Sequence, residues 1–323
     1  FASPHRRSDG MNPMKKLIAM MECAVLAGFM VCVSPLVSEQ PAEAQWQVPT
    51  DSIPLGRGAG TGFKTGPKLF SVDAYGAVGN GSTDDYTPIN NAYSACVTAG
   101  GGKVVFGPKS YAIGTTIAIR ASDCLFEGVG TEHYHDVGTN DFGSKLVWIG
   151  ASGGTMIDMS PTTGASAQRG SGGGIVGIGL DGNSGLAAIG LSVKSWQDAA
   201  FDIYITNFTN TGMYVGVVST LGESRDAQKN SIRVTGRQVD SASYGKCLVL
   251  DGDSTANSSL NHDITVNCSH RDAVAVDIIN ADNNIFYDLT LTQPTGAATA
   301  GLALRAGSSV SAYSNLFFRV ATN

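Results

Sequence analysis

Two short clusters in the second half of the chain carry the side chains that acid–base chemistry requires. Asp251 and Asp253 follow an apolar run in the segment VLDGDS, and His270, Arg271 and Asp272 follow a second such run. A pair of carboxylates can serve as acid and base, or as acid and nucleophile, in the hydrolysis of a glycosidic bond. Alternatively, one base could remove a proton beside a uronate carboxylate while Arg271 stabilises the negative charge that develops.

These clusters define a candidate site, together with aromatic rings that can stack on sugars. The catalytic candidates are Asp251, Asp253, His270 and Asp272, and the substrate-binding candidates are Arg271 and Tyr244. Further residues that could contribute are a second cation, Arg225, and the aromatic side chains of Trp148, Trp196, Tyr204 and Tyr214. Each candidate has a structural alternative. Aspartate is common in solvated turns, a histidine can simply lie at the surface, and single aromatic residues often pack or fill turns.

The metal signals in the sequence are weak. DGDS (251–254) begins like a calcium loop but lacks the rest of one. TEHYHD (131–136) places two histidines beside two acids, and an ordinary loop is the simpler interpretation. The cysteines show none of the short spacings that zinc sites use. We therefore assign no metal site and keep Ca²⁺ as a cofactor to consider only for a lyase.

The elements that would position these residues are short strands. From Leu125 onward no segment has the length and periodicity of a helix, and short alternating runs of apolar residues recur between Gly, Asn, Asp and Ser. Four of the units open with asparagine, at Asn230, Asn261, Asn284 and Asn315. A paired-strand unit that repeats every ~20–30 residues is typical of a β-solenoid, in which asparagine can line the tight turns as a ladder.

A β-sandwich is the alternative, but it would be rich in two-residue hairpins, whereas most of the links here are longer. In the solenoid layout each of two cysteine pairs lies close together. We therefore predict the disulfides Cys96–Cys124 and Cys247–Cys268, as an exported chain permits.

A solenoid exposes its core at each end and needs a cap. The stretch TDDYTPINNAYSACVTAG predicts a helix just before the first coil, with Asp84 as its capping residue and Pro88 in its first turn. The acidic pair Asp84 and Asp85 would then favour the positive N-terminus of this helix. We interpret the pair as structural rather than catalytic.

The segment Phe70–Gly114, FSVDAYGAVGNGSTDDYTPINNAYSACVTAGGGKVVFGPKSYAIG, resembles the opening module of the pectate lyase superfamily, in its rhamnogalacturonase/epimerase-like branch. That family reads G-A-x-G-D-G-x-x-D-D, a helix, and then G-G-G-x-V-x-F-P-x-G-x-Y. This chain departs mildly, with Asn80 for the usual Asp, Tyr86 for the usual Thr, and FGPKSY for FPxGxY. The likeness continues through 124–130 and 174–183 and then fades.

The resemblance implies an all-β fold, a right-handed single-stranded parallel β-helix (the pectin lyase fold) with an N-terminal capping helix. It also implies carbohydrate as the class of ligand. The opening module occurs in hydrolases, lyases, epimerases and phage tail-spike proteins, so it indicates the fold and not the reaction.

The related polygalacturonase-type hydrolases carry carboxylates at set positions, and this chain departs from each of them. Gly212 stands where N-T-D has its acid, Gly245 and Lys246 stand in place of both acids of D-D-C, and His270 lacks flanking glycines. No R-I-K occurs. That machinery is therefore expected to be absent or assembled from other residues.

The first part of the chain predicts export. Residues 1–13 precede Met14 and look like upstream read-through, and 14–44 have the basic start, apolar run and small-residue cleavage site of a secretory signal peptide. A membrane anchor is the alternative, since the apolar run is nearly long enough to span, but the flanking residues favour cleavage. We predict no stable membrane insertion after cleavage, and an extracellular or periplasmic product.

The mature chain is expected to have an arm or linker at 45–69 and the β-helix at 70–323. SNLFFRVATN opens a new coil without a polar cap after it, which predicts a domain truncated at its C-terminal end.

The bulk composition limits the partners. The net charge is −6 and charged residues make up 15% of the chain, so the basic surface that nucleic acids require is not expected. We expect a secreted polysaccharide-active protein, a glycoside hydrolase or polysaccharide lyase on a uronate-containing or related glycan. The alternatives are a non-catalytic glycan-binding surface adhesin and a phage-type depolymerase module. The sequence does not choose between a monomer and a trimer.

Overall fold

The computed structural model describes residues 68–130, 143–162, 169–218, 226–238, 245–252, 259–270, 274–292, 301–305 and 314–322. All of them belong to one compact unit, Phe63–Asn323. The predictions for residues 1–44, and for nearly all of 45–69, lie outside the described residues. In the first described strand pair, Leu69 lies opposite Lys103 in parallel.

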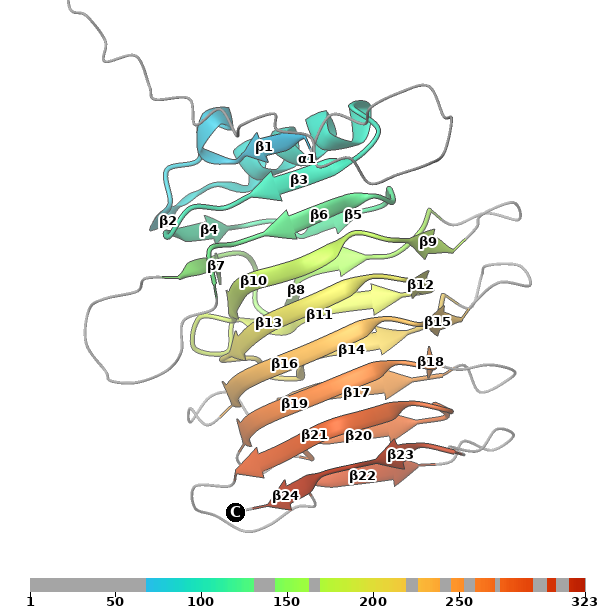
Figure 1. Ribbon diagram of the computed structural model, residues 1–323. Coiled ribbons are helices and arrows are strands. Elements are labelled where there is room, and N and C mark those ends of the chain that lie inside the picture. The colour runs from blue at the N-terminus through green and yellow to red at the C-terminus, as the bar shows by residue number, and fades with distance from the viewer. Residues whose placement is uncertain are drawn as a thin grey trace, which may run out of the picture. The chain divides into compact units, whose positions relative to one another are not determined.

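The described residues form three parallel sheets that run along a stack of coils, as Figure 1 shows. The first sheet follows the path β1 (Leu69–Ser71), β3 (Gly102–Val105), β6 (Cys124–Glu127), β10 (Gly174–Asp181), β13 (Ala200–Thr206), β16 (Ser231–Gln238), β19 (Asp263–His270), β21 (Ile285–Thr292) and β23 (Leu316–Phe317). Joined to this sheet are β2 (Asn80–Asp84), β4 (Ser110–Ile113), β7 (Ser144–Trp148) and β24 (Val320–Thr322).

The other two sheets are built in the same way. The second sheet contains β5 (Ile117–Ile119), β8 (Gly154–Met159), β11 (Ala187–Lys194), β14 (Thr211–Gly216), β17 (Lys246–Asp251), β20 (Val276–Ile279) and β22 (Leu302–Arg305). The third sheet contains β9 (Gly170–Ser171), β12 (Trp196–Gln197), β15 (Ala227–Gln228) and β18 (Ser259–Leu260). Each turn of the chain adds a strand to the sheets, so the fold is the predicted right-handed parallel β-helix.

The core forms because inward residues of successive coils lie in register. Phe201 of β13 pairs with Ile232 of β16, which pairs with Ile264 of β19, and all three side chains are buried. Alternate residues of a strand point to opposite faces, so the residues between them face outward. Apolar side chains at every second position therefore fill the interior, while polar ones line the outer faces.

A ladder of polar side chains runs inside the turn before the first sheet. The amide oxygen of Asn230 accepts the backbone N–H of Ala199 at 3.0 Å, and Asn284 and Asn315 repeat this arrangement further along the stack. Asn261 is not a rung of this ladder, because it is exposed, and it lies at a positive φ of 53°, the left-handed conformation that asparagine tolerates in tight turns. His262 takes its place, and its Nδ1 accepts the backbone N–H of Asn230 at 3.1 Å.

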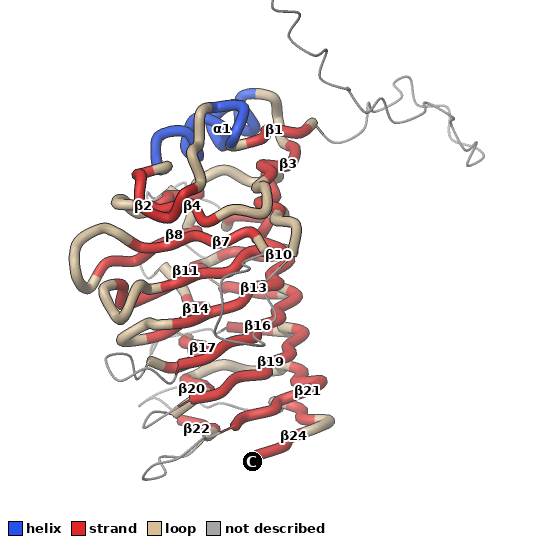
Figure 2. The backbone as a smooth tube through the Cα atoms, turned by 90° about the vertical axis from the view of Figure 1, so that its left-hand side faces the viewer, coloured by secondary structure: helices blue, strands red, loops and turns tan. Residues whose placement is uncertain are grey.

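Helix α1 (Tyr86–Thr98) covers the N-terminal end of the stack, as Figures 1 and 2 show, and the 3₁₀ turn η2 (Asp73–Tyr75) precedes it. The buried face of α1 contains Ile89, Ala92, Tyr93 and Cys96, and it is the face that the sequence pattern predicts. Among the described residues no helix is both long and apolar enough to span a membrane.

The acidic pair before α1 is structural, as predicted, but in a different way. Asp85, not Asp84, occupies the capping position, and its side chain makes no hydrogen bond to the helix. Instead, the almost completely buried Asp85 carboxylate accepts the backbone N–H groups of Val78 at 2.6 Å and Gly79 at 3.0 Å. Asp84 accepts N–H groups from Tyr86 and Gly114.

Both predicted disulfides are confirmed. Cys96 of α1 bonds to Cys124 of β6, with their Cα atoms 6.2 Å apart. Cys247 of β17 bonds to Cys268 of β19, with their Cα atoms 6.5 Å apart. The first disulfide fastens the capping helix to a coil, and the second joins two of the sheets across the core.

Candidate functional site

The outer face of the second sheet carries two adjoining hollows of about 600 Å³ and 400 Å³. The larger is lined by Arg120, Asp158, Ser160, Pro161, Thr162, Lys194, Val217 and Val218. The smaller is lined by Thr116, Thr155, Asp158, Ile189, Ser192, Lys194 and Tyr214. Because Asp158 and Lys194 belong to both, we treat the two hollows as one groove across β5, β8, β11 and β14.

Strand register places the groove residues side by side. Asp158 of β8 pairs with Ser192 of β11, which pairs with Tyr214 of β14. Lys194 stands two residues beyond Ser192, on the same outer face, opposite Gly216. A Cβ atom at Gly216 would lie 2.6 Å from the ring of Tyr214, so the glycine provides the space that this ring occupies.

One end of the groove holds an ion pair and two polar atoms that have no described hydrogen-bond partner. The guanidinium of Arg120 donates to Asp158 Oδ2 at 2.5 Å and to Ser160 Oγ at 2.6 Å. The other carboxylate oxygen of Asp158, and the hydroxyl of the buried Ser192, have no hydrogen-bond partner within the described part of the chain. Both atoms are buried, so this end of the groove holds unused hydrogen-bonding capacity just beneath its surface.

The middle of the groove holds a cation. Lys194 is half-buried, and its Nζ lies 6.0 Å from the centroid of the Tyr214 ring. No described carboxylate forms an ion pair with Lys194. An ammonium group in this position favours an anionic ligand.

Tyr214 lies between Lys194 and Asp251, one of the predicted catalytic residues, and contacts both. Its hydroxyl donates to Asp251 Oδ2 at 2.9 Å. Burial, followed by the negative charge of Asp251 and this hydrogen bond, raises the pKa of Tyr214 well above its ordinary value. Tyr214 therefore stays protonated at neutral pH and holds Asp251 by this hydrogen bond.

Beyond Asp251 the same face carries a buried carboxylate between two cations. Asp277 is fully buried, and Lys246 Nζ lies 2.6 Å from its Oδ2. Arg305 Nε lies 3.0 Å from Oδ1, without the alignment of a hydrogen bond. Lys246, which stands where the polygalacturonase-type hydrolases have an acid, thus balances an acid from the next coil.

The structure does not bring His270 together with Asp251. His270 is 2% exposed and points inward from the end of β19, so it is not the surface histidine of the alternative interpretation. The disulfide places Cys268, and with it His270, beside the start of β17. Asp251 ends β17, about 13 Å further along at ~3.3 Å per residue, and faces outward.

The other predicted site residues, Asp253, Arg271, Asp272, Tyr244 and Arg225, lie outside the described residues, as does the segment 131–136. Their roles stay predictions. Within the described residues no three His, Cys, Asp or Glu side chains gather in a way that could hold a metal ion.

Of the aromatic residues, only Tyr214 among those that the sequence suggested lines a described hollow of this groove. Trp148 and Trp196 are buried core residues, which agrees with the packing role given above as the alternative to a place in a groove. The sequence also gave no reason to select Asp158, Ser192 or Lys194. They lie on separate strands without a shared motif, and only the alternation of each strand could have indicated that they face outward.

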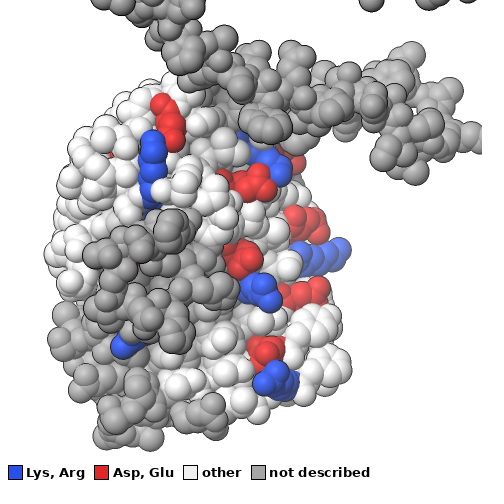
Figure 3. Space-filling model, turned by 60° about the vertical axis from the view of Figure 1, so that its left-hand side comes forward, with Lys and Arg blue, Asp and Glu red and all other residues white. Residues whose placement is uncertain are grey.

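Charge is mixed rather than separated on the face of the described residues that Figure 3 shows. In the view of Figure 3, basic and acidic side chains lie next to one another, and no broad region of a single sign is visible. On this face, recognition of a charged ligand would depend on individual charged groups rather than on a large field of one sign.

No family model and no curated protein matches the sequence. Several solved structures are similar in fold. ORF18 of Geobacillus virus E2 is 15% identical over 79% of this chain and 61% of its own, with a TM-score of 0.43. A candidate glycosyl hydrolase from Parabacteroides merdae ATCC 43184 is 13% identical over 79% of this chain and 96% of its own, with a TM-score of 0.42.

PfbA, a surface adhesin of Streptococcus pneumoniae, is 14% identical over 70% of this chain and 63% of its own, with a TM-score of 0.43. The chain thus spans less than two thirds of both the viral protein and PfbA. At these identities the similarities concern the fold alone. The assignment of a parallel β-helix rests on the strand pairing of this chain.

Proposed function

We propose that this protein is a polysaccharide-active β-helix protein that binds an acidic glycan in the groove across the second sheet. The observation that carries the proposal is Lys194, a cation without a described acidic partner at the centre of that groove. A uronate carboxylate is the group in a polysaccharide that would pair with it. The resemblance of Phe70–Gly114 to the pectate lyase superfamily supports the same class of ligand.

The groove suits an extended chain of sugars. Its lining comes from four successive strands, which are ~4.8 Å apart, so it runs along the stack rather than into the core. The hydroxyls of Thr116, Thr155 and Ser192 and the phenol of Tyr214 lie along this path. These are groups that hydrogen-bond to sugar hydroxyls.

The groove supports elimination better than hydrolysis. A hydrolase needs two carboxyl groups about 5–9.5 Å apart. Asp158 and Asp251 are three strands apart, which is about 14 Å or more at ~4.8 Å per strand. Asp277 is nearer to Asp251, but both of its oxygens face cations.

In elimination, a base removes the proton beside the uronate carboxylate, the bond to the leaving oxygen breaks, and that oxygen takes a proton. Lys194 would stabilise the charge on the carboxylate, and Tyr214, kept protonated, would supply the proton to the leaving oxygen. Asp251, within hydrogen-bond distance of Tyr214, would be the base: the proton that it takes from the carbon passes to Tyr214 and replaces the one that Tyr214 gives to the leaving oxygen. Ca²⁺ is a cofactor to test in this reaction.

Binding is tested with polygalacturonate and alginate oligomers in calorimetric titrations of the full chain. Lys194→Gln should weaken binding at least tenfold, because it removes the charge that meets the carboxylate. Lys103→Gln is the matched control, since Lys103 is a cation of the first sheet already paired with Glu127 at 2.8 Å. Equal affinity in wild type and Lys194→Gln would refute the proposal.

Turnover is followed on the same substrates, with and without Ca²⁺. New ultraviolet absorbance from unsaturated uronates, together with new reducing ends, indicates a lyase. Reducing ends alone would overturn the elimination mechanism in favour of a hydrolase. Binding with neither signal would leave the adhesin interpretation, in which the groove holds a glycan without cleaving it.

We also propose that the protein is exported. Its two disulfides are the kind of bond that persists in an oxidising compartment. N-terminal sequencing of the protein from its host would test cleavage after Ala44, and a retained apolar segment 17–37 would contradict it.

A further inference from the structure

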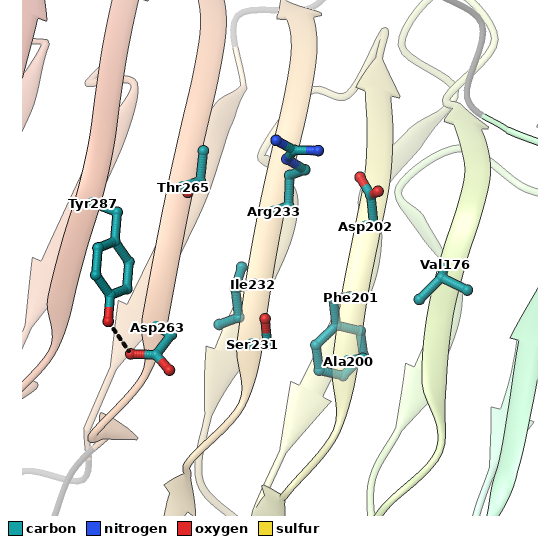
Figure 4. Close-up of a pocket in the computed structure, with 10 residues that line it drawn as sticks. All are labelled: Val176, Ala200, Phe201, Asp202, Ser231, Ile232, Arg233, Asp263, Thr265 and Tyr287. Carbon is teal, nitrogen blue, oxygen red and sulfur yellow. Dashed lines mark hydrogen bonds between the residues drawn. The ribbon is translucent and has the colours of Figure 1, made fainter.

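A third hollow, of about 420 Å³, lies on the outer face of the first sheet, away from the groove described above. Figure 4 shows its lining, which comes from β10, β13, β16, β19 and β21. The lining residues are Val176, Ala200, Phe201, Asp202, Ser231, Ile232, Arg233, Asp263, Thr265 and Tyr287. Its volume lies within the range of ~300–1,000 Å³ that is usual for small-molecule sites.

Three polar side chains at the centre of this hollow, Asp202, Arg233 and Thr265, make no hydrogen bond or ion pair with one another. Asp202, Arg233 and Thr265 occupy directly opposed positions on three neighbouring strands. Although Asp202 and Arg233 carry opposite charges, they form no ion pair, and neither makes a side-chain hydrogen bond within the described part of the chain. Their hydrogen-bonding groups are therefore free to meet a ligand.

A β-bulge supplies an aromatic wall. Ile264 pairs with Phe286 and Thr265 pairs with Asp288, so Tyr287 is the extra residue between them. Its hydroxyl donates to Asp263 Oδ1 at 3.3 Å.

The ring of Tyr287 stacks on Phe318 of the next coil, with centroids 5.8 Å apart and planes inclined by 6°. Phe318 covers one face of the ring, so the other face and the edge are left to line the hollow. About half of the Tyr287 surface is exposed.

The charges in the hollow indicate a ligand different from that of the groove. Asp202 and Asp263 contribute two carboxylates against the single guanidinium of Arg233, so the hollow repels a uronate rather than attracting it. Carboxylates accept hydrogen bonds from hydroxyls and a guanidinium donates to them, while an aromatic face packs on the apolar side of a sugar ring.

We propose that this hollow is a second carbohydrate site, which binds a neutral sugar unit through Asp202, Arg233 and Tyr287. It does not depend on the acidic-glycan groove, because the two sites lie on different sheets and share no residue.

The test is a titration of the full chain with cellotetraose, xylotetraose, maltotetraose and β-1,4-galactotetraose, followed by calorimetry and by the NMR signals of the sugar. We expect at least one neutral oligosaccharide to bind. The double variant Arg233→Ala/Tyr287→Ala should weaken that binding at least tenfold, whereas Lys194→Gln should not change it. Lys103→Ala is the control for loss of one cation from the first sheet, and circular dichroism verifies that each variant is folded.

Three results would overturn this proposal. One is that none of the four oligosaccharides binds at millimolar concentration while a polyuronate does. Another is that a neutral sugar binds equally well to wild type and to a folded Arg233→Ala/Tyr287→Ala protein. The third is that Lys194→Gln abolishes neutral-sugar binding, which would place both ligands in the groove. Failure of polyuronate binding alone would affect only the function proposed above.

Discussion

The most unusual single residue is His262, an imidazole within a ladder of asparagines. It is fully buried, and because Nδ1 accepts the N–H of Asn230, a neutral ring carries its proton on Nε2. Burial lowers the pKa of His262 to about 3, against an ordinary value of 6.5. Protonation would charge the ring and remove the acceptor on which the ladder depends.

His262 should make the fold acid-sensitive. Between pH 6.5 and about 3 the unfolded chain binds a proton here and the folded chain does not, so stability rises with pH, by ~1.4 kcal/mol per unit from this group. The stabilisation of the folded state that comes from keeping His262 neutral is fully present above pH 6.5 and is lost as the pH falls toward about 3. His262→Asn keeps the ladder acceptor without the titration.

Urea unfolding of wild type and His262→Asn at several pH values measures this contribution. We expect the difference in unfolding free energy between the two proteins to change by a few kcal/mol from pH 7 to pH 4, in favour of the variant at the acidic end. A difference that stays constant with pH would show that His262 does not titrate in this way.

A second notable group is the buried carboxylate of Asp277 with the two cations that balance it, Lys246 and Arg305. A buried carboxylate without a partner is much more costly than a partly exposed cation without one, because the cation can still be hydrated. The side chains of Lys246 and Arg305 are partly exposed, whereas the side chain of Asp277 is completely buried.

We therefore expect Lys246→Met/Arg305→Met to destabilise the protein by about 3–5 kcal/mol, and Asp277→Asn to cost clearly less. Chemical denaturation at pH 7 compares the two. If Asp277→Asn were the more damaging change, the carboxylate would have a role beyond balancing these charges.

At the scale of elements, the N-terminal cap depends on Asp85. This carboxylate satisfies two backbone N–H groups in the turn before α1, and it is buried, while its neighbour Asp84 is exposed. Asp85→Ala would leave both donors without a partner, and we expect a loss of about 2–4 kcal/mol. Asp84→Ala should cost about 1 kcal/mol or less.

Thermal unfolding measures both changes, and polyuronate binding serves as the functional readout. If Asp84→Ala and Asp85→Ala are folded but lose binding or turnover, the structural interpretation of the pair is incorrect.

The elements also show what a sequence can and cannot reveal about this molecule. Runs such as Phe201, Ile203 and Ile205 alternate in the way that a half-buried strand requires, so the coils and the cysteine pairs could be predicted from them. From the sequence, Asn261 looked like the ladder residue because asparagine is the usual rung and histidine is not. Which of the two neighbours points into the ladder depends on the backbone geometry of the turn, and the sequence does not show that geometry.

The candidate groove could be predicted only in part. Asp158, Lys194 and Tyr214 come from three strands and meet through strand register, and no short motif contains any two of them. Asp251 was selected as a candidate because it stands in an acidic cluster, and it meets the groove through the hydroxyl of Tyr214. His270 belongs to a similar cluster, but the alternation of β19 points it into the core.

At the scale of the whole molecule, the stack of coils predicts that stability is local. Each coil contacts its neighbours, so a lost disulfide should loosen mainly the coils that it joins. Each cross-link closes a loop, of 28 residues for Cys96–Cys124 and 21 for Cys247–Cys268, and is worth roughly 3 kcal/mol by chain entropy.

Hydrogen exchange measured by mass spectrometry tests this expectation. Cys96→Ala/Cys124→Ala should speed exchange in α1, β3 and β6, and Cys247→Ala/Cys268→Ala should do so in β17 and β19. A uniform change along the chain in either variant would mean that the β-helix unfolds as one cooperative unit.

The polar ladder has a consequence for how such a protein can change over time. The four rungs, Asn230, His262, Asn284 and Asn315, are separated by 32, 22 and 31 residues, and yet the strands beside them remain in register. Coils can therefore gain or lose a loop of about ten residues without shifting the strands above and below. Insertions between strands can therefore alter the surroundings of both proposed sites while the strands that carry these sites stay in place.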